Sequence, residues 1–203
     1  VIKDEDKFAV GDVSAFPYTV VNVKAGEIQV ILNNGINFYG IRYDATEGSA
    51  AEKVDKVWDF SAPEWVDAMT GSGIAANTND SNWNLEVNGL KVVSGGGSIK
   101  WNFSGETYYW QPGGKSDGTT RYFEFTTDVA GTVTVYSSNT GGSEDLTRMV
   151  TVKVGDADPE SLPGGTPSGD APTKNDFSVG AGTVKIYPTG NGLRFYKIEF
   201  HSL

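Results

Sequence analysis

Hydrophobic and polar residues alternate strictly over several short stretches of the chain, in which valine, threonine and tyrosine are prominent. The alternating stretches are 85–93, 98–103, 121–127, 131–138, 148–154 and 182–188. A period of two indicates antiparallel strands that bury one face. Asn88-Gly89 divides the first stretch into a predicted hairpin, because this pair favours a two-residue turn.

One stretch departs from this alternation and predicts a helix, SAPEWVDAMTG at residues 61–71. Ser61 can accept hydrogen bonds from the first backbone N–H groups, and Glu64 would close a capping box. Gly71 should end the helix. A single helix among many short strands leaves no material for a parallel α/β sheet. The predicted fold is therefore all-β, an antiparallel β-sandwich of jelly-roll type with one short helix.

Nearly the same ten-residue motif occurs twice, as NGINFYGIRY at 34–43 and NGLRFYKIEF at 191–200. Each copy predicts the second strand of a β-hairpin, and alternation places its Tyr, Ile and final aromatic residue in the core. In the second copy these core residues are Tyr196, Ile198 and Phe200. Phe195 should then lie on the opposite face of the strand.

The separation between the two copies is about the length of a domain and too long for a solenoid repeat. Residues 1–46 are therefore interpreted as an N-terminal β-hairpin segment, a tail-like copy of the closing strands of a sandwich module. The small and polar residues 47–56 read as a linker, and residues 57–203 as the complete sandwich domain. In the alternative interpretation, both hairpins belong to one sandwich.

Residues 155–176 contain four of the eight prolines and no aromatic residue, and they predict a long irregular loop. Such a loop is either disordered or solvent-exposed, or it binds a ligand or a metal. Asp156, Asp158 and Glu160 alternate here without the spacing of a calcium-binding loop, so they are interpreted as solvated charges. No metal or cofactor is expected, and a structural calcium ion is the alternative.

Charge narrows the choice of partners. The chain carries 16 Lys and Arg against 26 Asp and Glu, a formal charge of −10. This charge repels nucleic acids and anionic lipid surfaces, and also polyanionic polysaccharides unless calcium bridges the two. No apolar run reaches the roughly 20 residues that span a bilayer, and no signal peptide opens the chain. A neutral ligand fits best, with neither nucleic acid nor membrane insertion expected.

The aromatic residues are densest between Trp101 and Phe125. Alternation assigns four of them to the core: Trp101, Phe103, Phe123 and Phe125. Three consecutive aromatic residues cannot all face the core, and sugars stack on aromatic rings while amides and carboxylates bind their hydroxyls. The predicted ligand-binding residues are Tyr108, Tyr109, Trp110, Gln111 and Asp117. Alternatively, residues 108–110 cover the edge of the sandwich.

The remaining candidates for chemistry are interpreted as structural. Three tryptophans should be buried, Trp58, Trp65 and Trp83, and Arg148 should pair with Glu144 or Asp145. The single histidine, His201, leaves nothing for a Ser-His-Asp relay or a histidine-rich metal site, and the chain has no cysteine. No catalytic residue is therefore predicted, and the protein is not expected to be an enzyme.

Four short sequence segments together resemble those of a known type of module. They are VWDFSAPEW at 57–65, the strand at 131–138, RMVTVKV at 148–154 and GLRFYKIEF at 192–200. This set is similar to the β-sandwich modules of surface polysaccharide-utilisation proteins of Bacteroidetes, often found beside pectate-lyase-like domains. The resemblance covers about residues 57–202. It implies a jelly-roll of carbohydrate-binding type, located outside the cell, on the surface of a Gram-negative bacterium or in its periplasm.

The favoured hypothesis is thus a non-catalytic glycan-binding module of a bacterial cell-surface or secreted protein, bound to a polysaccharide or oligosaccharide and joined to neighbouring domains of a larger chain. The first alternative is a structural or adhesion spacer without a small-molecule ligand. The second is a hydrolase or lyase that acts on polysaccharides, because the spacing of paired carboxylates is set in space and not in sequence.

Overall fold

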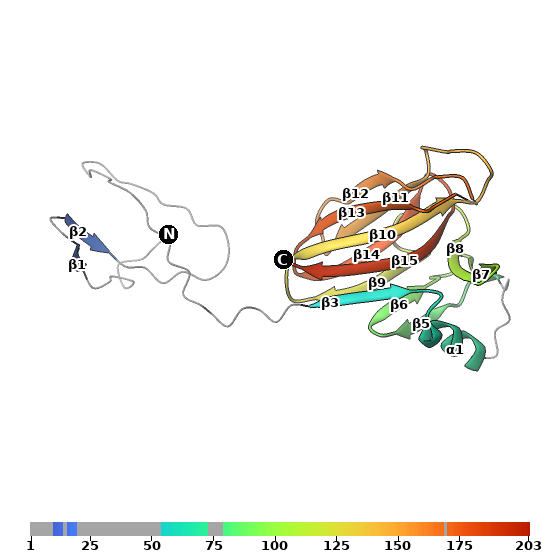
Figure 1. Ribbon diagram of the computed structural model, residues 1–203, viewed down its shortest axis with the longest axis horizontal. Coiled ribbons are helices and arrows are strands. Elements are labelled where there is room, and N and C mark those ends of the chain that lie inside the picture. The colour runs from blue at the N-terminus through green and yellow to red at the C-terminus, as the bar shows by residue number, and fades with distance from the viewer. Residues whose placement is uncertain (1–9, 14–15, 20–53, 73–78, 169) are drawn as a thin grey trace. The chain divides into compact units, whose positions relative to one another are not determined.

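The structure is a computed structural model that describes residues 10–13, 16–19, 54–72, 79–168 and 170–203 (Figure 1). The chain divides into two units, 1–47 and 48–203. In the first unit, strands β1 (Val10–Val13) and β2 (Phe16–Thr19) form an antiparallel hairpin. The predicted hairpin strand at 34–43 and most of the predicted linker lie outside the described residues.

The second unit is an antiparallel β-sandwich of jelly-roll type with one short helix, as the sequence predicts. Sheet I has the strand order β13–β10–β15–β8–β7–β4, and β3 pairs with β15. Its strands are β3 (Asp55–Asp59), β4 (Asn79–Asp80), β7 (Ile99–Ser104), β8 (Thr107–Pro112), β10 (Gly131–Asn139), β13 (Thr173–Val179) and β15 (Leu193–Ser202). In Figure 1, β13, β10, β15 and β3 lie side by side in this sheet.

Sheet II has the strand order β12–β11–β14–β9–β6–β5. Its strands are β5 (Asn84–Val87), β6 (Leu90–Val93), β9 (Tyr122–Thr127), β11 (Met149–Val154), β12 (Glu160–Pro163) and β14 (Gly182–Thr189). All six alternating stretches of the sequence are strands of one sheet or the other. The predicted hairpin turn is also present, since Asn88 and Gly89 both have a positive φ, 50° and 79°.

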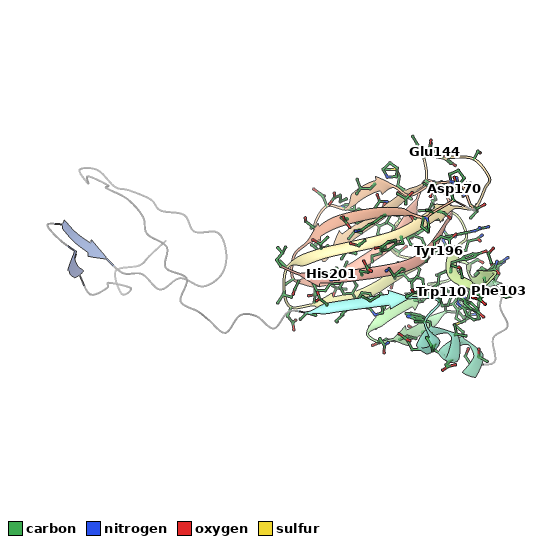
Figure 2. The ribbon with its side chains drawn as sticks, viewed as in Figure 1. Phe103, Trp110, Glu144, Asp170, Tyr196 and His201 are labelled. Carbon is green, nitrogen blue, oxygen red and sulfur yellow. The ribbon has the colours of Figure 1, made fainter. Side chains whose placement is uncertain are left out.

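Aromatic rings fill the core between the two sheets. Trp58, Trp65 and Trp83 are buried, as predicted, and so are three of the four rings assigned to the core between 101 and 125. Phe103 is the exception, with 46% of its surface exposed. It faces the same side as Trp101 but lies at the tip of the β7–β8 hairpin, close to the end of the sandwich (Figure 2).

Helix α1 (Pro63–Gly71) is present, but its start differs from the prediction. Ala62 is the N-cap residue and makes no side-chain capping bond. Ser61 Oγ instead accepts a hydrogen bond from the backbone N–H of Tyr108, at 2.9 Å. The predicted capping box is therefore wrong, because Ser61 ties the helix to the β7–β8 hairpin. Trp65 and Met69, one turn apart, are the buried side of the helix.

A bulge in β15 corrects the face assignment of the closing strand. The register between β10 and β15 runs from Tyr136 opposite Lys197 to Ser137 opposite Phe195, so Tyr196 is the extra residue. One extra residue reverses the alternation beyond it. Ile198 and Phe200 are buried as predicted, but Phe195 takes the core position and Tyr196 lies half-buried on the outer face.

The predicted irregular loop at 155–176 is also corrected. It contains β12 and the first residues of β13, which are edge strands of the two sheets. Prolines fit edge strands because only one side of such a strand donates to a neighbour. Asp156, Asp158 and Glu160 are exposed. Among the described residues, no helix is long and apolar enough to cross a membrane.

Candidate functional site

The five predicted ligand-binding residues do not form one platform. Successive residues of a strand point to opposite faces, so Tyr108 and Trp110 face the core while Tyr109 and Gln111 lie on the outer face of sheet I. Asp117 lies in the loop between β8 and β9. The structure thus separates the predicted set into three places.

Trp110 is a core residue and cannot contact a ligand. None of its surface is exposed, and its ring meets those of Trp83 and Trp65 edge to face, at centroid distances of 5.2 and 6.4 Å. Tyr108 is half-buried and stacks on Trp101 at 4.8 Å, with 15° between the ring planes. Assigning Trp110 to a binding platform is therefore wrong, because its ring is fully buried in the core against Trp65 and Trp83.

Tyr109 lies on the outer face of sheet I, but only 3% of its surface is exposed. Tyr196 packs against it at a ring distance of 5.5 Å, and the Arg194 guanidinium lies 4.9 Å from its ring centroid. Burial raises the pKa of the Tyr109 phenol, against the opposing effect of the Arg194 charge. Arg194 and Tyr196 thus pack on the Tyr109 ring and cover it, and Gln111 lies beside Tyr109 on the same face of the sheet.

Asp117 is exposed and forms a local turn. Its Oδ1 accepts hydrogen bonds from the backbone N–H and the hydroxyl of Thr119, at 3.0 and 2.6 Å. These bonds, the hydroxyl bond first, lower the pKa of the Asp117 carboxyl. The next residue, Gly118, lies so close to the Tyr187 ring that an added Cβ would be 3.0 Å from it. The loop therefore closes over the outer face of sheet II, where Tyr187 lies.

The same face of sheet II carries a pocket of about 480 Å³. It is bounded by β5, β6, the start of β9 and two turns, with the lining residues Ser81, Asn82, Trp83, Asn84, Lys91, Val93, Gly95, Gly96, Tyr122 and Glu124. Lys91 pairs with Glu124 and Val93 with Tyr122 in the register between β6 and β9, which makes these four residues the floor. The pocket is shallow and open to solvent, so a ligand would lie across it and would not be enclosed.

Charged groups on the floor are paired. Glu124 forms two ion pairs, one from its Oε1 to Lys91 Nζ at 3.6 Å and one from its Oε2 to Lys185 Nζ of β14 at 3.8 Å. The Lys185 Nζ also lies 4.2 Å from the centroid of the Tyr122 ring. One face of that ring is thus occupied by a cation, and the side chain is held in place. Asn82 and Asn84 add amide groups at the rim, which can both donate and accept hydrogen bonds.

The wall formed by the turn at 94–97 is fixed by its hydrogen bonds. Ser94 Oγ accepts from the backbone N–H of Trp83 at 3.0 Å and donates to the Asp80 carbonyl at 3.1 Å. Gly95 has a φ of +55°, and a Cβ there would come within 2.8 Å of the Thr119 carbonyl oxygen. Glycine is therefore required at 95, and the Asp117 loop supports the wall from behind.

The pocket lining offers an aromatic ring, amide groups and paired charges. The described residues include no group of three or more His, Cys, Asp and Glu side chains that could hold a metal ion. His201 lies on β15, and its Nδ1 is 2.9 Å from an Asp55 carboxylate oxygen. β15 belongs to sheet I, so His201 lies away from the pocket on sheet II (Figure 2). Rings, amides and paired charges on a preformed surface can bind a polar, uncharged molecule.

Sequence reasoning missed the pocket. Its outward-facing Tyr122 and Glu124 alternate with core residues in RYFEF, so their orientation could be read from the sequence. Their meeting with Lys91 and the asparagines could not, because it depends on which strands become neighbours. Arg148 does pair with Asp145, at 2.8 Å, as one of the two predicted alternatives.

No protein-family model matches the sequence, and no curated protein matches it either. Three solved structures illustrate what the fold is similar to. The first, titled for glycan recognition by the Ruminococcus flavefaciens cellulosome, is 12% identical, with a TM-score of 0.38; the match covers 74% of this chain and 95% of that one. The CBM22-1-CBM22-2 tandem domain of Paenibacillus barcinonensis Xyn10C is also 12% identical, with a TM-score of 0.33 and coverages of 63% and 42%.

The third is exo-beta-1,3-galactanase from Phanerochaete chrysosporium, solved with galactose. It is 15% identical, with a TM-score of 0.38, and the match covers 63% of this chain and 30% of that one. At these identities and TM-scores, the likenesses transfer no residue, ligand or activity to this chain. The function has to be argued from its own surface.

Proposed function

We propose that the 48–203 unit is a non-catalytic glycan-binding module and that it binds a neutral oligosaccharide or polysaccharide in the pocket on sheet II. The observation that carries this proposal is the combination of a concave floor with Tyr122, the paired Glu124 and the amides of Asn82 and Asn84. A sugar ring offers C–H groups to an aromatic surface and hydroxyls to amides and charged groups.

A neutral ligand suits the pairing on the floor. Glu124 is compensated by two lysines, so sugar hydroxyls can donate to its carboxylate and accept from Lys91 without adding an unpaired charge. The turn at 94–97 is held by hydrogen bonds before any ligand arrives, so little ordering is required on binding. The assignment to a cell-surface, secreted or periplasmic bacterial protein is part of the proposal and is supported by the resemblance described for residues 57–202.

Isothermal titration calorimetry against a panel of neutral oligosaccharides tests this function. Tyr122→Ala should weaken binding of the best ligand about tenfold, since it removes the ring from the floor. Tyr136→Ala is the matched control, because Tyr136 is another half-buried tyrosine but lies on sheet I. The Tyr136→Ala protein should bind the same oligosaccharide with the affinity of the wild type.

The competing function is a spacer or adhesion module without a sugar ligand. It predicts that no member of the panel binds, or that the Tyr122→Ala and Tyr136→Ala proteins bind as the wild type does. The hydrolase or lyase alternative requires turnover of a polysaccharide that disappears with Glu124→Gln. A protein that binds an oligosaccharide without turning it over would exclude the hydrolase and lyase alternatives and support the binding function.

A further inference from the structure

The outer face of sheet I carries a second group of side chains that the pocket on sheet II does not use. Arg194 lies over Tyr109, with Tyr196 beside it, and Gln111 is two residues from Tyr109 on the same face. Across the β7–β8 pairing, Lys100 is opposite Gln111 and Asn102 is opposite Tyr109. We call these six residues the Arg194 face: Lys100, Asn102, Tyr109, Gln111, Arg194 and Tyr196.

Arg194 is a half-buried cation without an anion in the part of the chain that the structure describes. No ion pair or hydrogen bond joins its guanidinium to another described residue, and its Nε is buried without a partner. Lys91, Lys185, Lys197 and Arg148 pair with carboxylates, whereas other described basic residues, such as Lys100 and Lys153, do not. Arg121 also has a buried Nε without a partner, but its guanidinium donates to two backbone carbonyls. Arg194 differs from these residues because its Nε is buried and its guanidinium has neither an ion pair nor a hydrogen bond among the described residues.

A buried donor that stays unpaired costs about 1 to 3 kcal/mol, and the Arg194 Nε is such a donor. A ligand that offers an acceptor to the guanidinium would remove this cost. The planar fork of the guanidinium matches a carboxylate in a bidentate arrangement. The Arg194 Cζ lies over the Tyr109 ring, 4.9 Å from its centroid, and the Tyr196 hydroxyl is hydrogen-bonded to Ser138 Oγ at 3.0 Å. The guanidinium thus lies over the Tyr109 ring before a ligand binds.

The neighbours of Arg194 specify more than an anion. Gln111 and Asn102 provide amides for hydroxyl groups, and the Tyr196 ring is half-exposed for C–H groups. Lys100 adds a second cation with no ion-pair partner among the described residues, one strand beyond Gln111. We propose that the Arg194 face is a second binding site, separate from the sheet II pocket, and that it takes the carboxylate of a single uronic acid residue on an otherwise neutral glycan.

The total charge of the protein limits the ligand to few carboxylates. At −10, the chain repels a polyuronate over a Debye length of about 8 to 10 Å, whereas one carboxylate set on Arg194 meets local positive charge. The site therefore discriminates between a neutral chain that carries one uronate and a chain made of uronates.

Calorimetry with two matched oligosaccharides tests the site, one with a single terminal glucuronate and the other with glucose in its place. The wild type should bind the glucuronate form at least about tenfold more tightly, and Arg194→Gln should remove that difference. Arg194→Lys should remove most of it, because the charge stays but the fork is lost. Lys174→Gln is the control, since Lys174 is exposed on the same sheet at the outer strand β13; it should retain the preference.

Nuclear magnetic resonance of the wild type makes the test independent of how the variants fold. The Arg194 Nε–H resonance should shift when the glucuronate oligosaccharide is added, and less with acetate or inorganic phosphate at the same concentration. Equal affinity for the two oligosaccharides, an unchanged preference in Arg194→Gln, or an equal response to acetate would overturn the proposal. Loss of neutral-sugar binding with Tyr122→Ala is a separate outcome, so failure of the pocket and failure of the Arg194 face are distinguishable.

Discussion

Replacing Trp110 by alanine should destabilise the sandwich and should not act as a simple loss of ligand. Trp110 has no exposed surface and packs between Trp65 and Trp83. A tryptophan side chain buries roughly 150 to 250 Å², which corresponds to about 4 to 6 kcal/mol of transfer free energy at 25 cal/mol per Å². Measured Trp→Ala changes in protein cores fall at about 3 to 5 kcal/mol, and we expect a value in that range.

Urea unfolding followed by far-UV circular dichroism measures this change in the free energy of unfolding. In a thermal scan, the same loss should lower Tm by roughly 6 to 20 °C for a unit of this size. Trp110→Phe should cost less, because the indole Nε1 has no hydrogen-bond partner within the described residues and only volume is lost. Phe103→Ala is the control, since 46% of Phe103 is exposed on the same hairpin, and it should cost less than about 1.5 kcal/mol.

A Trp110→Ala protein that unfolds within about 0.5 kcal/mol of the wild type would refute the packing argument. It would show that the three indole rings do not form a closed core and would return Trp110 to the candidate ligand residues. A large loss of stability in both Trp110→Ala and Phe103→Ala would instead show that the whole hairpin, and not the burial of one ring, sets the stability.

Two further predictions concern polar groups. Burial alone would raise the pKa of Glu199, but hydrogen bonds from Lys197 at 2.6 Å and from the Tyr136 hydroxyl at 3.1 Å outweigh it and hold that pKa below its usual value. The carboxylate therefore stabilises the fold above its unfolded pKa of about 4.3, and this contribution disappears as pH falls through the lowered folded pKa. Urea unfolding of Glu199→Gln should differ from the wild type at pH 7, and the difference should shrink as pH falls below the unfolded pKa; a difference that stays constant would contradict the linkage. Arg148→Ala should lower the free energy of unfolding by about 1 to 3 kcal/mol, because the guanidinium donates a 2.7 Å hydrogen bond to the carbonyl of buried Gly192. Glu144 is exposed, so Glu144→Ala should leave the free energy of unfolding almost unchanged. Equal losses in urea unfolding of the two variants would exclude this role for Arg148.

Much of the fold could be read from local sequence because alternation reports directly on a half-buried strand. The runs at 131–138, 148–154 and 182–188 were predicted as strands and correspond to β10, β11 and β14. The helix at 61–71 was also predictable from its composition. Its cap was not, since Ser61 could bond either to the helix or to Tyr108, and a residue far along the chain provided the preferred donor.

The candidate site was predicted only in part. Aromatic density drew attention to the β7–β8 hairpin, where Tyr109 and Gln111 lie on the outer face of sheet I and Tyr108 and Trp110 do not. The density could not show that Trp110 packs against Trp65 and Trp83 or that Arg194 covers Tyr109, because these contacts join different strands and the helix, which are distant in the sequence. The pocket on sheet II was missed for the same reason, since its floor needs β6 beside β9.

The sequence by itself determined that six alternating stretches form strands that bury one face, because alternation is a property of residues a few positions apart; it did not locate β12 or the start of β13. The tertiary structure decided the rest. A single bulge at Tyr196 exchanged the roles of Phe195 and Tyr196, and thereby placed a tyrosine beside Arg194. Strand order brought Glu124 between two lysines. Both outcomes depend on long-range pairing, which is selected by the packing of the whole core and not by any local pattern.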